Sequence, residues 1–275
     1  MMKKNVMKYF AITLIFCSLI QGCDTRMDME FTDWPIIEAY LNPGNPFLVR
    51  VTRQVPFLED VEYSSDNIDS LDLLITCNDT VYIPEPTGNG YYCDSALMVT
   101  EGTTYTLTFA FNNKPVIAYT YVPVKPSNFE QSETSISIER MDSTNSPPSG
   151  GGSMPDPISL TWDNEDLSYY LLVVENIEDS LDPIRDFGDE DPPENIFRKA
   201  PNTSTSEELR PNDFQYYGTH RIILFHVLPD YAALYEQSSN SSQDLTSPST
   251  SIGNGYGIFT GMNSDTLWIE VVEAK

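Results

Sequence analysis

The sequence predicts an all-β protein made of two immunoglobulin-like β-sandwich domains in tandem, and two observations lead to this prediction. Short runs rich in β-branched and aromatic residues alternate between apolar and polar positions, as in 47–53, where Phe47, Val49 and Val51 share one face. This alternation is typical of a strand with one buried face. Asn, Gly and Pro residues separate the runs at short intervals, which is the spacing of antiparallel sandwiches.

Residues 34–125 are expected to form the first sandwich. The runs 35–41 and 47–53 flank a turn rich in Asn, Gly and Pro, and a similar pair of runs lies at 103–111 and 116–122. Both pairs predict β-hairpins. With six or seven strands in this region, the module resembles a transthyretin-like or carboxypeptidase-regulatory-like sandwich.

Residues 126–275 are expected to form the second sandwich, with an acidic insertion at 178–215. A Pro/Gly/Ser run at 146–153 predicts a loop near its start. Trp162 closes one short predicted strand, and a tyrosine-rich strand follows at 169–175. This combination resembles the opening of a fibronectin type III domain.

One segment of the chain departs from the strand pattern and is predicted to form a short helix. It covers residues 229–237 and begins with Pro229, a residue that is favoured in the first turn of a helix. We expect Leu234 of this helix to pack on the second sandwich.

The N-terminus has the order of an export signal. Three lysines precede an apolar run that is too short to span a membrane, and a small residue, Gly22, stands before Cys23. This arrangement resembles a bacterial lipobox, in which the cysteine receives a lipid and becomes the first residue of the mature chain. Residues 1–22 are therefore predicted to be a signal peptide, Cys23 the lipidated residue and 23–33 a polar stalk. Acyl chains attached to Cys23 would anchor the protein to a membrane.

The mature chain is strongly acidic. Removing the predicted signal peptide takes away three of the 15 basic residues and none of the 41 acidic ones, which changes the net charge from −26 to −29. Such a surface repels nucleic acid, so no nucleic-acid partner is expected.

Cys77 and Cys93 are the two cysteines that remain once Cys17 leaves with the signal peptide and Cys23 is lipidated. They lie on predicted strands on either side of a turn at 84–90. In an oxidising compartment they either form a disulfide across the two strands or stay as a pair of buried thiols.

The segment 178–194 contains eight carboxylates and one arginine. It is predicted to be a solvated insertion, and the alternative is a calcium site that uses Asp186, Asp189, Glu190 and Asp191. The spacing does not match an EF-hand. Neither a nucleophile-elbow nor a zinc-protease motif occurs, and the two histidines, His220 and His226, lie on or beside one predicted strand. No enzymatic activity and no other cofactor are expected.

Several short motifs give the chain a resemblance to the DUF4249 lipoproteins of Bacteroidetes. In the first half these motifs are the strand pair from Ile36 to Thr52, the sequence Gly90 to Tyr92 followed by Gly102 to Leu107, and the pair Val122 and Pro123. In the second half they are the strand Tyr170 to Val174, the helix Tyr231 to Tyr235 and the glycine-rich stretch Asn254 to Gly261. The resemblance covers nearly the whole mature chain. It implies an accessory role beside a TonB-dependent outer-membrane transporter, and it transfers no catalytic residues.

Bacteroidetes glycosylate exported proteins on Ser or Thr that follows Asp and precedes a small or aliphatic residue. Six such triplets occur here, whereas composition alone gives about one or two by chance. The predicted acceptors are Ser70, Thr80, Ser95, Ser143, Ser180 and Thr266.

These observations together predict a non-enzymatic outer-membrane lipoprotein that binds a protein partner or a nutrient beside a transporter. The alternative is an adhesin-like or structural cell-surface module. In lipoproteins of the Bacteroidetes type that this chain resembles, acidic residues soon after the lipidated cysteine accompany export to the cell surface. Asp28 and Glu30 loosely match this pattern, so the resemblance implies the cell surface, and the periplasmic face stays the alternative location.

Overall fold

A computed structural model describes residues 33–54, 68–141, 155–187, 191–238 and 251–274. The fold of these residues is all-β, as the sequence predicts, and they form one compact unit. No helix in the described part is long and apolar enough to cross a membrane. The first eight strands are β1 (Pro35–Leu41), β2 (Pro46–Arg53), β3 (Leu74–Cys77), β4 (Thr80–Tyr82), β5 (Glu85–Gly88), β6 (Tyr91–Met98), β7 (Thr103–Phe111) and β8 (Lys114–Val122).

The remaining elements include one α-helix and one 3-10 turn among the described residues. The strands are β9 (Glu130–Gln131), β10 (Ser135–Ile138), β11 (Ile158–Thr161), β12 (Tyr169–Asn176), β13 (Asp182–Pro183), β14 (Ile196–Arg198), β15 (Ser206–Leu209), β16 (Tyr216–Val227), β17 (Ile252–Gly253) and β18 (Tyr256–Glu273). The helical elements are η1 (Pro211–Asp213) and α2 (Pro229–Ser238). Helix α2 confirms the helix predicted at 229–237.

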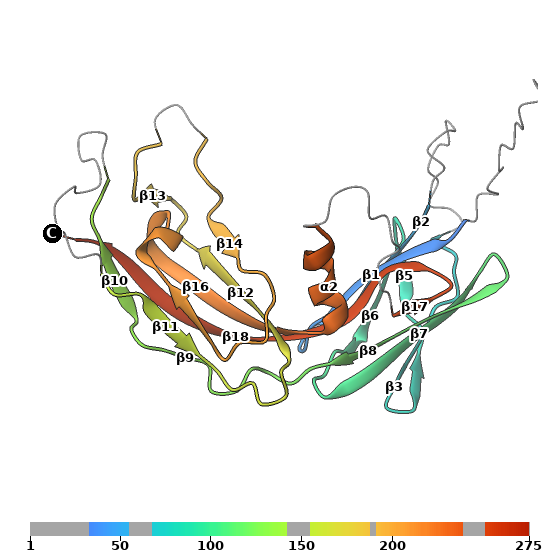
Figure 1. Ribbon diagram of the computed structural model, residues 1–275. Helices are drawn as coiled ribbons and strands as arrows, with labels where there is room; N and C mark the ends of the chain where they lie inside the picture. Colours follow the sequence, from blue (N-terminus) through green and yellow to red (C-terminus); the bar gives the residue numbers. More distant parts are fainter. Residues whose placement is uncertain (1–32, 55–67, 142–154, 188–190, 239–250, 275) are drawn as a thin grey trace, which may run out of the picture. The chain divides into compact units, whose positions relative to one another are not determined.

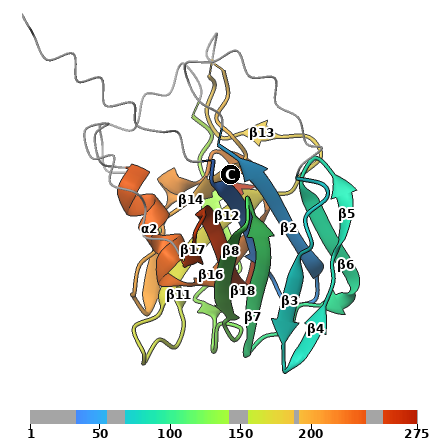
Figure 2. The same cartoon turned by 90° about the vertical axis from the view of Figure 1, so that its right-hand side faces the viewer.

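The strands form three sheets (Figure 1). The largest has ten strands, with the main order β14-β12-β16-β18-β1-β2-β6-β5, while β10 pairs with β18 and β13 pairs with β16. A five-stranded sheet has the order β17-β8-β7-β3-β4, and a three-stranded sheet has the order β15-β11-β9. Figure 2 shows β8, β7, β3 and β4 side by side in this order.

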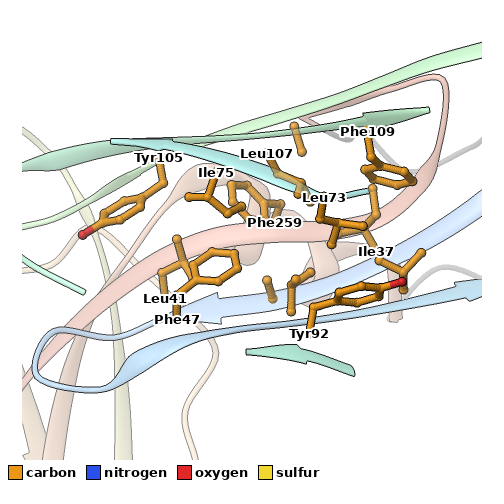
Figure 3. Close-up of a cluster of buried hydrophobic side chains, with 14 of the residues drawn as sticks. Ile37, Leu41, Phe47, Leu73, Ile75, Tyr92, Tyr105, Leu107, Phe109 and Phe259 are labelled. Atoms are coloured by element: carbon orange, nitrogen blue, oxygen red, sulfur yellow. The ribbon is translucent and has the colours of Figure 1, made fainter. Parts of the chain in front are cut away.

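The first hydrophobic core lies between the five-stranded sheet and the strands β1, β2, β6 and the first part of β18. Alternate residues of each strand point into it, and Ile37, Phe47 and Tyr92 are fully buried there. Figure 3 shows Phe259 of β18 among Ile75, Leu107 and Leu73. The core of the predicted first domain therefore contains a residue from the C-terminal strand.

The second core lies between the three-stranded sheet and the strands β10, β12, β16 and the second part of β18. Trp162 packs at its centre against Phe129 and Tyr170, with ring centroids 6.3 and 5.8 Å away. Residues of β12 are buried on both faces, because Leu171 and Val173 contribute to a third cluster on the opposite side of the sheet.

Strand β18 belongs to both cores. Its residues from Tyr256 to Gly261 pair in parallel with β1, and its residues from Met262 to Val271 pair antiparallel with β16. The predicted boundary near residue 125 therefore separates the first core from two of its own residues, Ile252 and Phe259. The two sandwiches share a strand and are not independent segments of the sequence.

Helix α2 packs over the large sheet through its tyrosines. Tyr231 and Tyr235 pack against the third cluster, and the Tyr231 ring meets Tyr40 of β1 edge-on at 6.1 Å. The Asp230 carboxylate accepts a hydrogen bond of 2.9 Å from the Thr260 hydroxyl. The expectation for Leu234 is wrong: this side chain is exposed, because the buried face of the helix carries Tyr231 and Ala232.

Candidate functional site

The lipidation residue, Cys23, lies outside the described residues, and its modification stays a prediction. Of the two alternatives for Cys77 and Cys93, the structure does not contain the disulfide: both are free thiols, Cys77 buried and Cys93 partly buried. Cys77 lies on β3 of the five-stranded sheet and points into the first core, whereas Cys93 lies on β6 of the large sheet beside the inward-facing Tyr92. Successive residues of a strand point to opposite faces, so Cys93 points away from that core.

The proposed calcium ligands are only partly described. Asp186 and Asp191 are exposed, while Asp189 and Glu190 lie outside the described residues. Within the described ranges no group of three or more acidic, histidine or cysteine side chains is arranged to hold a metal ion. The calcium site stays a prediction.

The predicted glycosylation acceptors differ in accessibility. Ser70, Thr80, Ser95 and Ser180 are exposed, and Thr266 is partly buried within β18. Ser143 lies outside the described residues. Attachment of a glycan needs an accessible hydroxyl, so the four exposed residues are the ones that the fold leaves available.

His220 is buried on β16, where both ring nitrogens lie within hydrogen-bonding distance of neighbouring groups. Its Nδ1 lies 3.0 Å from the Gly218 carbonyl oxygen, and its Nε2 lies 3.4 Å from Asn176 Nδ2. The ring is neutral in this arrangement, with Nδ1–H donating to the carbonyl and Nε2 accepting from the amide. Burial lowers the pKa of His220 below its usual 6.5, although the Gly218 carbonyl and Glu178 partly oppose this effect.

A pH-dependent loss of stability is expected from His220. In the unfolded chain its pKa is the usual 6.5, so on acidification the unfolded chain takes up the proton before the folded chain does. The contribution of neutral His220 to the free energy of unfolding is therefore complete above pH 6.5. It decreases as the pH falls below this value, until the folded chain also takes up the proton.

Urea denaturation of the wild type and of His220→Gln between pH 5 and 8 measures this effect. The difference between their free energies of unfolding should shrink toward pH 5, because contributions from the many carboxylates cancel in the comparison. A constant difference across this range would contradict the prediction.

A continuous uncharged surface covers the outer side of the five-stranded sheet. It consists of the residues of β3, β4, β7 and β8 that alternate with core residues. They are Leu74, Thr76, Val81, Thr104, Thr106, Thr108, Ala110, Pro115, Ile117, Tyr119 and Tyr121, and we call this set the threonine–tyrosine face. None of the outward-facing residues of these four strands is charged, although the chain has 41 acidic residues.

The strand register places the face residues in rows. One row crosses all four strands through Val81, Thr76, Thr106 and Tyr119. A neighbouring row contains Leu74, Thr108 and Ile117, and Thr104 stands opposite Tyr121 in a third. Adjacent strands lie about 4.8 Å apart, so these side chains form one contiguous surface.

The large side chains of the face are open to solvent. Tyr119 is 62% exposed, Val81 57% and Ile117 48%. Contiguous apolar surface of this kind on a soluble domain usually marks a site of interaction. The threonine hydroxyls add hydrogen-bonding groups without adding charge.

Comparison with protein-family models matches residues 24–267 to a domain of unknown function, DUF4249. The chain belongs to the DUF4249 family. The match spans both sandwiches and confirms the family that the sequence motifs indicate. No curated protein matches the chain. The DUF4249 description names no activity.

Sequence reasoning missed the threonine–tyrosine face of this DUF4249 chain, although its signal is present. In 103–111 and 116–122 the polar positions of the alternation are occupied by Thr and Tyr, where a solvent-facing strand of an acidic protein would carry Asp, Glu or Lys. The alternation predicts two strands. That their outer faces join with those of β3 and β4 depends on the sheet order.

Proposed function

We propose that this DUF4249 protein is a non-enzymatic accessory lipoprotein of the outer membrane that docks through its threonine–tyrosine face on a TonB-dependent transporter. The observation that carries the proposal is the absence of charge from this face in a chain of net charge −26. The cores of protein interfaces are depleted in charged residues and enriched in tyrosine.

The rest of the chain supports this role through electrostatics and attachment. An acidic surface opposes unspecific association with other acidic proteins, so an uncharged patch gives the contact a defined place. A lipid on Cys23 would confine the protein to the membrane and raise its effective concentration near a membrane-embedded partner.

The test is affinity capture from native outer membranes with the wild type and two aspartate variants. Tyr119→Asp places a charge at the centre of the face. Trp268→Asp is the matched control, because Trp268 is also a well-exposed aromatic residue, 51% against 62% for Tyr119, on a strand outside the five-stranded sheet. Both positions are on the surface, so each change should alter the free energy of unfolding by about 0.5 kcal/mol or less.

The wild type and Trp268→Asp are expected to co-purify a β-barrel transporter. Tyr119→Asp should weaken this association by about 2 kcal/mol or more, roughly 30-fold in Kd, which is the size of a hot-spot effect. The proposal is wrong if no barrel is captured by the wild type, or if all three proteins retain it equally.

A further inference from the structure

A second feature, separate from the threonine–tyrosine face, is a cavity of about 330 Å³ at the end of the second core. Its lining residues come from β12, β14 and the start of β16, whose ribbons Figure 1 labels, and from Arg185, residues 193–195, Asp213 and Gln215. Val174, Ile196 and Phe197 give it an apolar lining. Small-molecule sites in proteins begin at about 300 Å³ and combine such a lining with a few polar groups.

The walls of the cavity are held in place by hydrogen bonds. The Tyr216 hydroxyl donates to the Pro193 carbonyl over 2.5 Å, and Asn195 Nδ2 donates to the Asn176 carbonyl over 2.9 Å. The Ile184 amide donates to the Gln215 carbonyl over 2.9 Å. The first two bonds attach residues 193–195 to β16 and β12, and the third joins the two ends of the insertion. The cavity is therefore preformed, and a ligand does not have to order these segments when it binds.

Positively and negatively charged side chains line the cavity and, among the described residues, form no ion pair with one another. Arg185 contributes a guanidinium group, and Glu194 and Asp213 contribute carboxylates. In the described part of the chain no ion pair joins Arg185 to either acid, and its guanidinium carbon lies 5.0 Å from the Phe187 ring centroid. The Asp213 carboxylate accepts a hydrogen bond from the Arg210 amide, which fixes its position.

We propose that this cavity binds a small zwitterion with an apolar side chain, of the size of a dipeptide. The ligand's carboxylate contacts Arg185, its ammonium group contacts Glu194 and Asp213, and its side chains lie on Ile196 and Phe197. Arginine suits a carboxylate because its planar donors match the two oxygens.

The charge pattern argues against a simple ion as the ligand. A divalent cation would be attracted by the two carboxylates but repelled by the guanidinium group of Arg185. An anion would be attracted by Arg185 but repelled by the two carboxylates. A zwitterion satisfies both signs at once, which also leaves the net charge of the site unchanged. Since Arg185 and Glu194 are exposed to solvent, their contribution is reduced by screening, and an affinity in the micromolar to millimolar range is expected.

The experiment is calorimetric titration of the full chain in detergent with the dipeptide Leu-Leu, its N-acetylated form and its C-terminal amide. The protein variants are Arg185→Gln and Glu194→Gln. The control is Arg198→Gln, which removes an arginine of β14 that pairs with Val173 of the third cluster and does not line the cavity. Melting temperatures of all variants establish that each one is folded.

Leu-Leu should bind the wild type and Arg198→Gln equally. Arg185→Gln should weaken the binding of Leu-Leu about ten-fold, since bonds between arginine and carboxylate are among the strong hydrogen bonds. The C-terminal amide of Leu-Leu has no carboxylate, so it should bind Arg185→Gln and the wild type with the same affinity. Glu194→Gln should weaken Leu-Leu and leave the acetylated form unchanged. The inference is overturned if Leu-Leu does not bind at millimolar concentration, or if blocking either end of the peptide has no effect.

This result is independent of the docking test. Variants of the cavity should still capture the membrane partner, and Tyr119→Asp should still bind Leu-Leu.

Discussion

A fragment of residues 33–125, which contains the whole predicted first domain, is expected to remain unfolded. In the complete chain every residue of β1 from Ile36 to Leu41 pairs with β18, and the fragment lacks that strand. It also lacks Phe259 and Ile252, which are 0% and 5% exposed in the first core. Truncating a buried phenylalanine to alanine alone costs about 3–5 kcal/mol, and domains of this size have only about 5–15 kcal/mol in total.

Circular dichroism and proton NMR measure this directly. The fragment should show no cooperative thermal transition and little dispersion of its amide signals, whereas residues 33–275 should show both. Adding a peptide of residues 251–275 in excess should restore structure, because binding to the folded form alone shifts the equilibrium toward it. A cooperative transition of the fragment by itself would contradict the shared-strand architecture.

Gly257→Ala is expected to destabilise the protein by about 3 kcal/mol or more, through a backbone clash added to conformational strain. Gly257 has a φ of +100° at the point where β18 meets β1. A Cβ atom at this position would lie 2.0 Å from the carbonyl oxygen of Ile37. Because that oxygen belongs to a strand of the core, it has little freedom to move.

Gly102→Ala is the matched control for this prediction. Gly102 also has a positive φ, +68°, but a Cβ there would meet nothing within 4 Å. It should therefore show the conformational cost alone, about 1 kcal/mol. Urea denaturation of both variants separates the two contributions, and equal losses would show that the approach of β18 to β1 is less tight than the structure indicates.

Local features of the chain were predictable because they depend on neighbouring residues. The alternation in 47–53 and 103–111 is the pattern of a half-buried strand wherever it occurs, and it corresponds to β2 and β7. Pro229 marks the beginning of α2 correctly. Several glycines within a strand are typical of a close backbone approach, and in the stretch 253–257 a Cβ at Gly257 would lie 2.0 Å from the Ile37 carbonyl oxygen.

The predictions that the structure does not support concern contacts between residues that are distant in sequence. Cys77 and Cys93 lie close enough along the chain to suggest neighbouring strands, yet the chain changes sheet between β4 and β5. In the same way, the helical pattern of 229–237 does not specify which face is buried. Tyr40 of β1 and the third cluster select the face with Tyr231, and Leu234 is left exposed.

By itself the sequence determined that this protein is all-β, that one short helix interrupts it, and that it belongs with the DUF4249 proteins. Only the tertiary structure decided that β18 joins two cores, that four uncharged strand faces form one surface, and that Arg185 and Glu194 line the same cavity. The physical reason is that a period of two fixes which side of a strand is buried, whereas the partner of that strand depends on which distant apolar surfaces pack together.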